Sequence, residues 1–309
     1  MQYNFNSLWC EKYRPKTLDD FICSNTNKDI IDSFVIKKEI PNLLFVGPPG
    51  LGKTSLAKII VNEILNCQYL YINASDENGI DTIRNKVTGF AQTKSIDGCI
   101  KVIVLDECDG LTMDAQRVLR NTMEEFAGIT RFILTANYAY KVIPALQSRC
   151  QNLDLTPPLE SVVKRCGHIL KNESITIPQE QKLALVEFIK NTYPDLRKCI
   201  NELQKQSSSG TLKLSINQND EIFALIYKEV KNKNITQLRK ALIDSEQSFN
   251  NDYISLLRGL FNYIEANEAD TKLKGDSLVL LAEHLYRASF VVDQEINCYA
   301  CLIQLAKLI

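Results

Sequence analysis

Residues Gly47 to Thr54 have the types and the spacing of a phosphate-binding loop. They fit the pattern G-x-x-x-x-G-K-[ST], and they lie between an apolar run and a helical stretch. Glycines let the backbone curve so that its N–H groups point at phosphate oxygens. We expect Lys53 to reach the β- and γ-phosphates and the Thr54 hydroxyl to bind Mg²⁺. The residues expected around the phosphates are Gly47, Pro48, Pro49, Gly50, Leu51, Gly52, Lys53, Thr54 and Ser55.

Two carboxylates, Asp106 and Glu107, follow the apolar run at 101–105. Open α/β sheets bind their ligands at the carboxyl ends of such buried strands. We therefore expect Asp106 to hold Mg²⁺ through its water shell, and Glu107 to orient or deprotonate the attacking water. Asn137 follows the next apolar run, 131–135, where its amide could contact the γ-phosphate or that water. Taken alone, an Asn that caps a turn is the simpler interpretation.

Short apolar runs that alternate with helical stretches must position these groups. The expected strands are 43–46, 69–73, 101–105 and 131–135. This alternation, over about residues 22–155, predicts an α/β fold with a parallel sheet covered on both faces. Before it, Pro15 favours an extended arm over a helix in residues 7–21.

The rest of the chain has helical periodicity only. Pro157 and Pro158 end the α/β region, residues 159–206 predict a small helical domain, and Ser207–Gly210 predicts its end. Residues 216–309 repeat apolar residues at helical spacing. Examples are Leu278, Leu281, Leu285 and Ala288.

Composition restricts the class of protein. The formal net charge of −1 means that any nucleic-acid contact must come from a local basic patch. The 10 cysteines lie mostly in apolar context, which suits reduced thiols. Cys298 and Cys301 are expected in a helical core, and His168 and His284 near the surface.

No apolar run has transmembrane length, and residues 1–6 lack the basic-then-apolar pattern of a signal peptide. We therefore expect no membrane association. The expected location is the cytoplasm or the nucleus, or a host cytoplasm if the source is viral.

Arg149 lies in the stretch Gln147-Ser148-Arg149-Cys150, beyond the last expected strand. This place is poorly suited to contact with the phosphate loop of its own chain. An arginine in such a place could instead reach the γ-phosphate bound by a neighbouring subunit, as an arginine finger supplied in trans does.

Five motifs together resemble those of sliding-clamp loader small subunits. They are residues 9–15, 47–54, 106–109, 135–137 and 148–150, in the order and spacing found in replication factor C small subunits and in the T4-type phage clamp-loader ATPase. These are AAA+ proteins, and the likeness is close over roughly residues 1–210. It implies an AAA+ nucleotide-binding domain at 1–155, a helical lid at 156–212 and an all-α collar at 213–309.

The resemblance also implies an ATP-driven pentameric ring that opens a sliding clamp and places it on primer-template DNA. Its cofactors would be ATP and Mg²⁺. By the same resemblance, Asn137 is the sensor 1 residue, Arg149 the finger that acts in trans, and Arg197 the sensor 2 residue that touches the γ-phosphate. Residues expected to flank the adenine are Glu11, Tyr13, Arg14 and Pro15.

The family's DNA-contacting helix matches the stretch that opens at Gly79. Asp81 could cap this helix. Arg84 and Lys86 are the candidates for template phosphates, although they could simply be solvated surface cations. Gln116 resembles a glutamine that couples DNA contact to Glu107.

Two departures from the family pattern stand out. Cys108 replaces the commoner Ala between the acidic residues, which leaves both catalytic carboxylates intact. Asn121 stands where many relatives carry a second Arg, which weakens the case for a further arginine acting in trans at that place.

Two other functions compete with a clamp loader. One is a Holliday-junction motor, which would carry a winged-helix domain, but residues 216–309 show no β-hairpin signal. The other is a nucleotide-binding scaffold that never hydrolyses, which would need neither Asp106, Glu107 nor Arg149. The four-cysteine zinc module of bacterial clamp loaders has no counterpart in the sequence.

Overall fold

The structure is a computed structural model of the chain. Its backbone forms two compact units, which divide between Leu214 and Ser215. Each unit is described by itself. The structure describes residues 8–93, 100–214, 218–249, 251–288 and 290–309, so the N-terminal segment 1–6 lies outside the described residues.

The first unit contains a five-stranded sheet with the order β2-β3-β4-β1-β5, in which every paired strand is parallel. The four predicted strands are confirmed, and β5 was missed because only one of its four residues is buried. Its polar composition gives no apolar run to recognise. The strands are β1 (Leu43–Val46), β2 (Tyr69–Asn73), β3 (Lys101–Asp106), β4 (Thr130–Ala136) and β5 (Gln151–Asp154).

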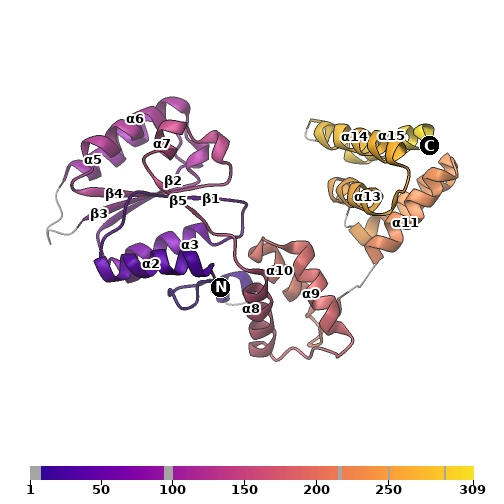
Figure 1. Cartoon of the computed structure of the whole chain (residues 1–309), viewed down its shortest axis with the longest axis horizontal. Helices are drawn as coiled ribbons and strands as arrows, with labels where there is room; N and C mark the ends of the chain where they lie inside the picture. Colours follow the sequence, from indigo (N-terminus) through magenta and orange to yellow (C-terminus); the bar gives the residue numbers. More distant parts are fainter. Residues whose placement is uncertain (1–7, 94–99, 215–217, 250, 289) are drawn as a thin grey trace, which may run out of the picture. The chain divides into compact units, whose positions relative to one another are not determined.

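Helices cover both faces of this sheet, as predicted (Figure 1). On one face lie α2 (Asn25–Lys37) and α3 (Lys53–Ile59), the latter extended by a π-helical turn, η2 (Ile60–Ile64). The other face carries several shorter elements and one long helix, α6. They are α4 (Ile80–Thr82), η3 (Ile83–Val87), α5 (Thr88–Gln92), α6 (Met113–Glu125) and α7 (Pro144–Gln147).

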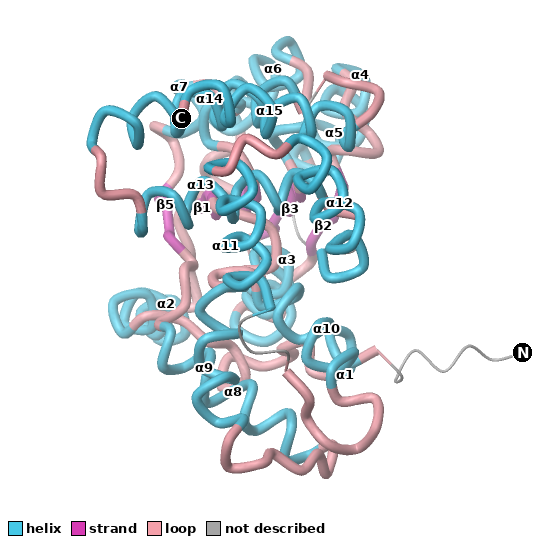
Figure 2. The backbone as a smooth tube through the Cα atoms, turned by 90° about the vertical axis from the view of Figure 1, so that its right-hand side faces the viewer, coloured by secondary structure: helices cyan, strands magenta, loops and turns pink. Residues whose placement is uncertain are grey.

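A helical lid follows β5, and the N-terminal arm packs against it. The lid consists of α8 (Leu159–Asn172), α9 (Gln181–Thr192) and α10 (Leu196–Gln206). The arm is not wholly extended as predicted, because Trp9–Lys12 forms a short helix, α1, beside α10 (Figure 2). The Trp9 side chain is buried in the lid core, and the backbone N–H of Trp9 donates to Gln204 Oε1 at 2.9 Å. Tertiary packing therefore induces a turn of helix that the local sequence does not favour.

The described residues of the second unit form helices joined by short connections, and they include no strand. Its helices are α11 (Gln218–Lys231), α12 (Ile235–Ser245), η6 (Glu246–Phe249), α13 (Tyr253–Asn267), α14 (Thr271–Arg287) and α15 (Gln294–Leu308). Cys298 and Cys301 are fully buried in its core, as predicted.

The prediction that His284 lies near the surface is wrong. Its side chain is buried, with Nδ1 2.9 Å from Asn297 Oδ1 and Nε2 3.2 Å from Gln304 Oε1. These amides satisfy both ring nitrogens, which makes burial of the imidazole tolerable. His168 is exposed, as predicted. None of the helices in the described part of the chain combines the length and apolar content that crossing a bilayer requires.

Candidate nucleotide site

The phosphate-binding loop connects β1 to the N-terminus of α3, as the sequence predicts. Gly50 and Gly52 have φ angles of 83° and 85°, a left-handed conformation that glycine adopts without steric cost. At Gly50 an added Cβ would lie 1.8 Å from the Asp195 Oδ1 atom of the lid. The loop and the lid therefore approach so closely that a side chain at Gly50 would separate them.

Lys53 lies at the centre of the site with only 8% of its side chain exposed. Its Nζ donates to the backbone oxygens of Gly47 at 2.7 Å and Pro48 at 2.9 Å, and to Asn137 Oδ1 at 2.8 Å. Burial lowers the pKa of the Lys53 ammonium group, and nearby carboxylates, first Asp106, act in the opposite direction. Lys53 and Asn137, 84 residues apart in the chain, are thus brought together.

The Asp106 carboxylate is surrounded by hydroxyl groups. Oδ1 accepts from Thr135 Oγ1 at 2.6 Å and lies 2.9 Å from Thr54 Oγ1. Oδ2 lies 2.8 Å from Thr54 Oγ1 and accepts from the Tyr71 hydroxyl at 2.7 Å. Burial raises the pKa of Tyr71, and the bond to Asp106 adds to this, so the phenol stays protonated and donates. A carboxylate beside the loop hydroxyl is an all-oxygen donor set that fits Mg²⁺.

Glu107 is held by a serine that the sequence analysis did not single out. Its backbone has a left-handed φ of 55°, and its N–H donates to Thr135 Oγ1 at 3.0 Å. Glu107 Oε2 accepts from Ser75 Oγ at 2.5 Å. Ser75 lies two residues after the end of β2, so its polar side chain near a neighbouring strand end was the available signal. The bond to Ser75 occupies an oxygen that would otherwise be free to accept a proton from water.

The arm residues named for the adenine line one cavity. Glu11, Tyr13, Arg14 and Pro15 lie there with Gly50, Gly52 and Ser55 of the loop region, and with Arg197 of the lid. Cys10, Phe21 and Arg165 line it too and were not predicted.

Contacts between side chains fix the arm at this cavity. Arg14 Nε donates to Ser55 Oγ at 3.1 Å, which ties the arm to the phosphate-binding helix. The Tyr13 hydroxyl donates to Glu173 Oε1 at 2.6 Å, which ties the arm to the lid.

A second, more polar cavity adjoins the first. Both are lined by Arg14 and Arg197, and the second also by Lys53, Asp106 and Glu107. Thr54 and Asn137 line it as well. The apolar cavity can hold a base and the polar one a triphosphate, with Arg197 beside both.

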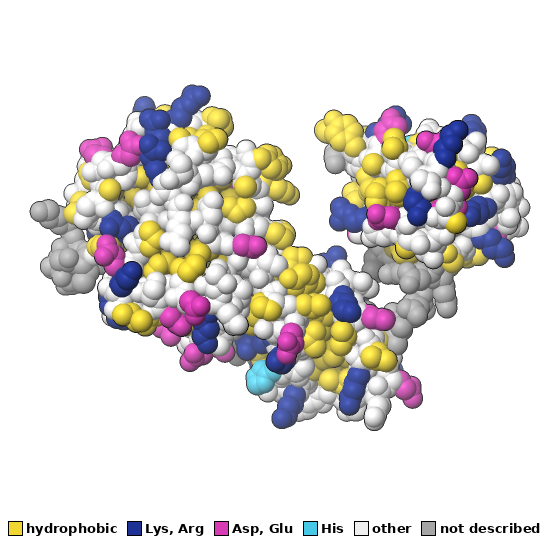
Figure 3. Space-filling view, viewed as in Figure 1, with side chains coloured by type: hydrophobic (Ala, Val, Ile, Leu, Met, Phe, Trp, Pro, Cys, Tyr) yellow, Lys and Arg dark blue, Asp and Glu magenta, His cyan; other side chains and the backbone are white. Residues whose placement is uncertain are grey.

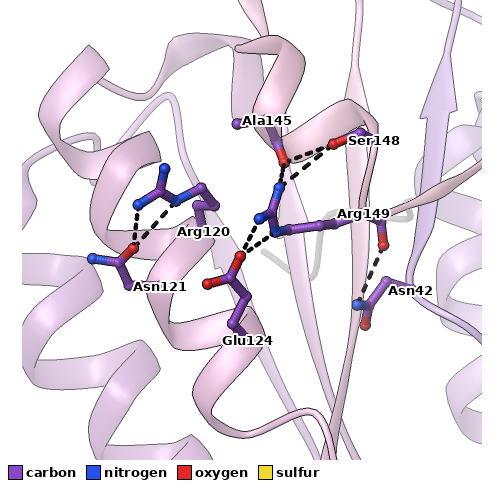
Figure 4. A network of polar contacts seen from close by, with 7 residues as sticks. All are labelled: Asn42, Arg120, Asn121, Glu124, Ala145, Ser148 and Arg149. Atoms are coloured by element: carbon purple, nitrogen blue, oxygen red, sulfur yellow. Dashed lines mark hydrogen bonds and ion pairs between the residues drawn. The ribbon is translucent and has the colours of Figure 1, made fainter.

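Arg149 does not line either cavity. Figure 4 shows its guanidinium pointing at Glu124 of α6, which accepts from both Nε and Nη2, and at the backbone oxygen of Ala145, 2.6 Å from Nη1. Glu124 and Arg149 are 25 residues apart in the chain, so the residues adjoining Arg149 give no sign of this ion pair. Arg120, in the same view, donates to Asn121 Oδ1.

The DNA candidates Arg84 and Lys86 are exposed on η3. Lys86 forms a salt bridge with Glu77 at 2.6 Å, whereas Arg84 has none within the described residues. The prediction that Asp81 caps this helix is wrong, because Gly79 occupies the N-cap position and no side chain caps it. Figure 3 shows Lys and Arg side chains gathered over the helical layer that contains α6.

Gln116 is buried and bonds only to backbone groups. Its Nε2 donates to the oxygens of Leu111 and Lys141, and its Oε1 accepts from the N–H of Ile143. It therefore joins α6 to the segment after β4 and is not hydrogen-bonded to Glu107. Within the described ranges, no cluster of three His, Cys, Asp or Glu side chains could hold a metal ion such as zinc.

Comparisons with known proteins cover most of the chain. Residues 43–157 match the family model of the ATPase family associated with various cellular activities (AAA), and residues 158–217 match that of the sliding-clamp-loader large subunit, AAA+ ATPase lid domain. The replication factor C small subunit of Picrophilus torridus is 38% identical over 297 residues, which are 92% of each chain. That of Saccharolobus solfataricus is 38% identical over 317 residues, 97% of this chain and 94% of the relative.

Among solved structures, the Thermotoga maritima RuvB Holliday junction branch migration motor superposes with a TM-score of 0.52 at 20% identity. The alignment covers 74% of this chain and 85% of that one. At this identity the likeness concerns the fold alone.

Proposed function

The chain belongs to the replication factor C small subunits, which are AAA+ ATPases, and from this premise we propose that it works in a multi-subunit clamp loader. It hydrolyses ATP there, and the assembly opens a ring-shaped sliding clamp and places it on primer-template DNA. The loader is a pentameric ring whose location is the cytoplasm or the nucleus. Residues 1–155 bind the nucleotide, 156–212 form the lid and 213–309 the collar that holds the ring together.

One observation carries the proposal. Groups from the arm, the loop, the ends of β3 and β4 and the lid meet around two adjoining cavities, of which one suits a base and the other a triphosphate. A scaffold that only binds nucleotide needs no carboxylate placed to activate water. Glu107 lines the triphosphate cavity beside Lys53 and Asp106, so the site has the groups for hydrolysis as well as for binding.

Hydrolysis requires a change of hydrogen-bond partners within the site. The backbone N–H groups of the loop bind the phosphates, and Lys53 exchanges the oxygens of Gly47 and Pro48 for the β- and γ-phosphates. Thr54 and Asp106 would hold Mg²⁺, which would supply positive charge to neutralise the phosphates during transfer. Glu107 leaves Ser75, orients the attacking water and accepts its proton, while Asn137 and Arg197 contact the γ-phosphate.

Arg149 completes the site of the neighbouring subunit. Two features support this role: Arg149 lines neither cavity of its own chain, and 34% of its side chain is exposed. At the neighbour's γ-phosphate its guanidinium would stabilise the charge that develops during transfer. Hydrolysis then depends on the assembled ring.

DNA binding is assigned to Arg84 and Lys86. Phosphate contacts need exposed cations, and both side chains are exposed on a helix that packs against α6. Arg84 is the stronger candidate because it forms no salt bridge with a described residue, so no intramolecular partner must be displaced.

The RuvB likeness keeps a branch-migration motor as the second candidate. Sequence identity favours the clamp loader, at 38% against 20%. In addition, the described residues from 218 onward contain helices and no strand, whereas a winged-helix domain includes a β-hairpin.

The decisive experiment measures ATP turnover by the chain with its partner subunits, with and without the clamp, primed DNA and a four-way junction. We expect stimulation by the clamp with primed DNA. A Glu107→Gln variant should bind ATP and open the clamp without releasing it, and Glu125→Gln, an exposed change on α6, is its control. Stimulation by the junction alone would favour a branch-migration motor, and absence of turnover under every condition would favour a scaffold.

A further inference from the structure

Tyr71, on the edge strand β2, donates a hydrogen bond to Asp106 that no motif predicts. We propose that the Tyr71 hydroxyl is a positioning group for the carboxylate that holds Mg²⁺. It is not a catalytic residue, because it acts on the metal through Asp106. The inference rests on the proposed Mg²⁺ site and adds to it a residue that sets the affinity for the metal.

The sheet places Tyr71 where it can do this. β2 pairs only with β3, the strand that ends at Asp106, and Tyr71 is in register with Val104. From there its side chain extends past the strand end to Asp106 Oδ2 at 2.7 Å. On the other side of β3, Thr135 of β4 donates to Oδ1 at 2.6 Å. The carboxylate is therefore held from both neighbouring strands, one donor on each oxygen.

The third donor, Thr54, differs from these two. Its hydroxyl comes from the phosphate-binding helix and lies 2.8 and 2.9 Å from the two oxygens of Asp106. In the proposed site this hydroxyl would also bind Mg²⁺ when a nucleotide is bound, and its contact with Asp106 would then change. Tyr71 and Thr135 are not metal ligands, and they can keep the carboxylate in one orientation throughout that exchange.

The Tyr71 ring is itself fixed. Lys58 Nζ lies 4.9 Å from the ring centroid, close enough for a cation–π interaction. Lys58 is on α3, the helix that begins with Lys53 and Thr54. Tyr71 therefore contacts both the helix that carries the metal-binding hydroxyl and the strand that carries the carboxylate. Partners that orient metal ligands in this way strongly affect the affinity of a site for its metal.

Tyr69 provides a matched control within the same strand. It lies two residues earlier, on the same face of β2, and each of the two side chains is 37% exposed. At this exposure water could satisfy either hydroxyl, so burial alone does not require the bond to Asp106. Tyr69 forms no hydrogen bond with that carboxylate.

The test compares Tyr71→Phe with Tyr69→Phe in the full chain. Binding of a fluorescent ATP analogue is measured at equilibrium, first in EDTA and then as Mg²⁺ is added. We expect Tyr71→Phe to bind as the unsubstituted chain does in EDTA, but to need about 10-fold more Mg²⁺ for half of the magnesium-dependent gain in affinity. Tyr69→Phe should match the unsubstituted chain under both conditions. Titration with Mn²⁺ in the presence of ATP, followed by electron paramagnetic resonance, should give the same ratio.

Each other outcome has a distinct meaning. An unchanged Mg²⁺ midpoint for Tyr71→Phe would overturn the inference and leave the proposed function intact. A loss of binding in EDTA equal to the loss in Mg²⁺ would also overturn it, because the hydroxyl would then support only the fold. If the unsubstituted chain gains no affinity from Mg²⁺, the metal site itself is wrong. Thr135→Val, which removes the opposite donor, should shift the midpoint in the same direction, and no shift would contradict positioning from both sides.

Discussion

The surroundings of Asp106 and those of Arg149 are two polar networks of the same domain built in opposite ways. Around Asp106, side chains of β2, β4 and α3 converge on one carboxylate that is only 7% exposed. Around Arg149, one exposed carboxylate from α6 and one backbone oxygen are the main partners, and Glu124 is 51% exposed. The network around Asp106 is buried and has all of its hydrogen-bond donors within the domain. The network around Arg149 lies at the surface of the domain.

This difference bears on how an active site can be shared between two subunits. Leaving a buried polar group without its partner costs about 1–3 kcal/mol, so the Asp106 network must form within its own chain. An exposed ion pair contributes about 0–1 kcal/mol, so Arg149 can exchange Glu124 for a neighbour's phosphate at little cost. Under the proposed function, the chain would bind ATP alone and would need a second copy or a related subunit to hydrolyse it.

The largest effect is expected from a substitution in the buried nucleotide site. Lys53→Ala should abolish ATP binding, because it removes the ammonium group expected to contact the β- and γ-phosphates, while the fold stays intact. Equilibrium binding with a labelled nucleotide, together with the thermal unfolding curve, checks this. Lys28→Ala, an exposed change on α2, is the control. Unchanged affinity for ATP would contradict the assignment of the loop.

The next largest effect is expected from a substitution in the surface network around Arg149. Arg149→Ala should retain ATP binding and lower turnover in the assembled ring by about 10³-fold or more, the range known for arginine fingers. Mixing it with Lys53→Ala subunits should restore part of the turnover, since an intact loop then meets an intact finger. The experiment requires that the chain occupy adjacent positions in the ring. Mixed rings without any recovery would mean that Arg149 acts within its own chain or only in structure.

A third change extends the comparison to Arg84, which is more exposed than the half-buried Arg149 and forms no salt bridge with a described residue. Arg84→Glu should weaken stimulation by primed DNA alike across templates and leave basal ATP binding unchanged. The slope of the logarithm of DNA affinity against that of salt concentration should fall by about 1. Arg117→Glu is the control, because Arg117 is also exposed but is paired with Asp114. Equal DNA affinity and salt slope would leave Arg84 a solvated surface cation.

The smallest effects compare the stability of the two networks directly. Thr135→Val should lower the free energy of unfolding by about 1–3 kcal/mol, because it removes a buried donor to Asp106 and the acceptor of the Glu107 N–H. Glu124→Gln should lower it by less than about 1 kcal/mol. Urea denaturation of both variants, with Glu125→Gln as the surface control, tests this order. If both variants lose the same free energy of unfolding, the difference in burial between the two networks has no effect on their stability.

Local patterns were sufficient for much of the fold and for part of the site. The loop from Gly47 to Thr54, the acidic end of β3 and four of the five strands were predictable because each is encoded in a few adjacent residues. The short helix of the arm and β5 were not. Trp9 becomes helical against the lid, and β5 is recognised only by its pairing with β1. The roles of the site residues and the domain limits at 155 and 212 stay predictions.

By itself, the sequence determined the chemistry available at this site: a cation, a hydroxyl and two carboxylates, at spacings that place them at strand ends. Only the tertiary structure decided which partners hold them. Tyr71 reaches Asp106 from the neighbouring strand β2, and Ser75 reaches Glu107 from the turn after that strand. Glu124 reaches Arg149 from α6. The physical reason is that a hydrogen bond depends on distance in space, and residues 25 to 35 positions apart are brought within 3 Å only by sheet pairing and helix packing.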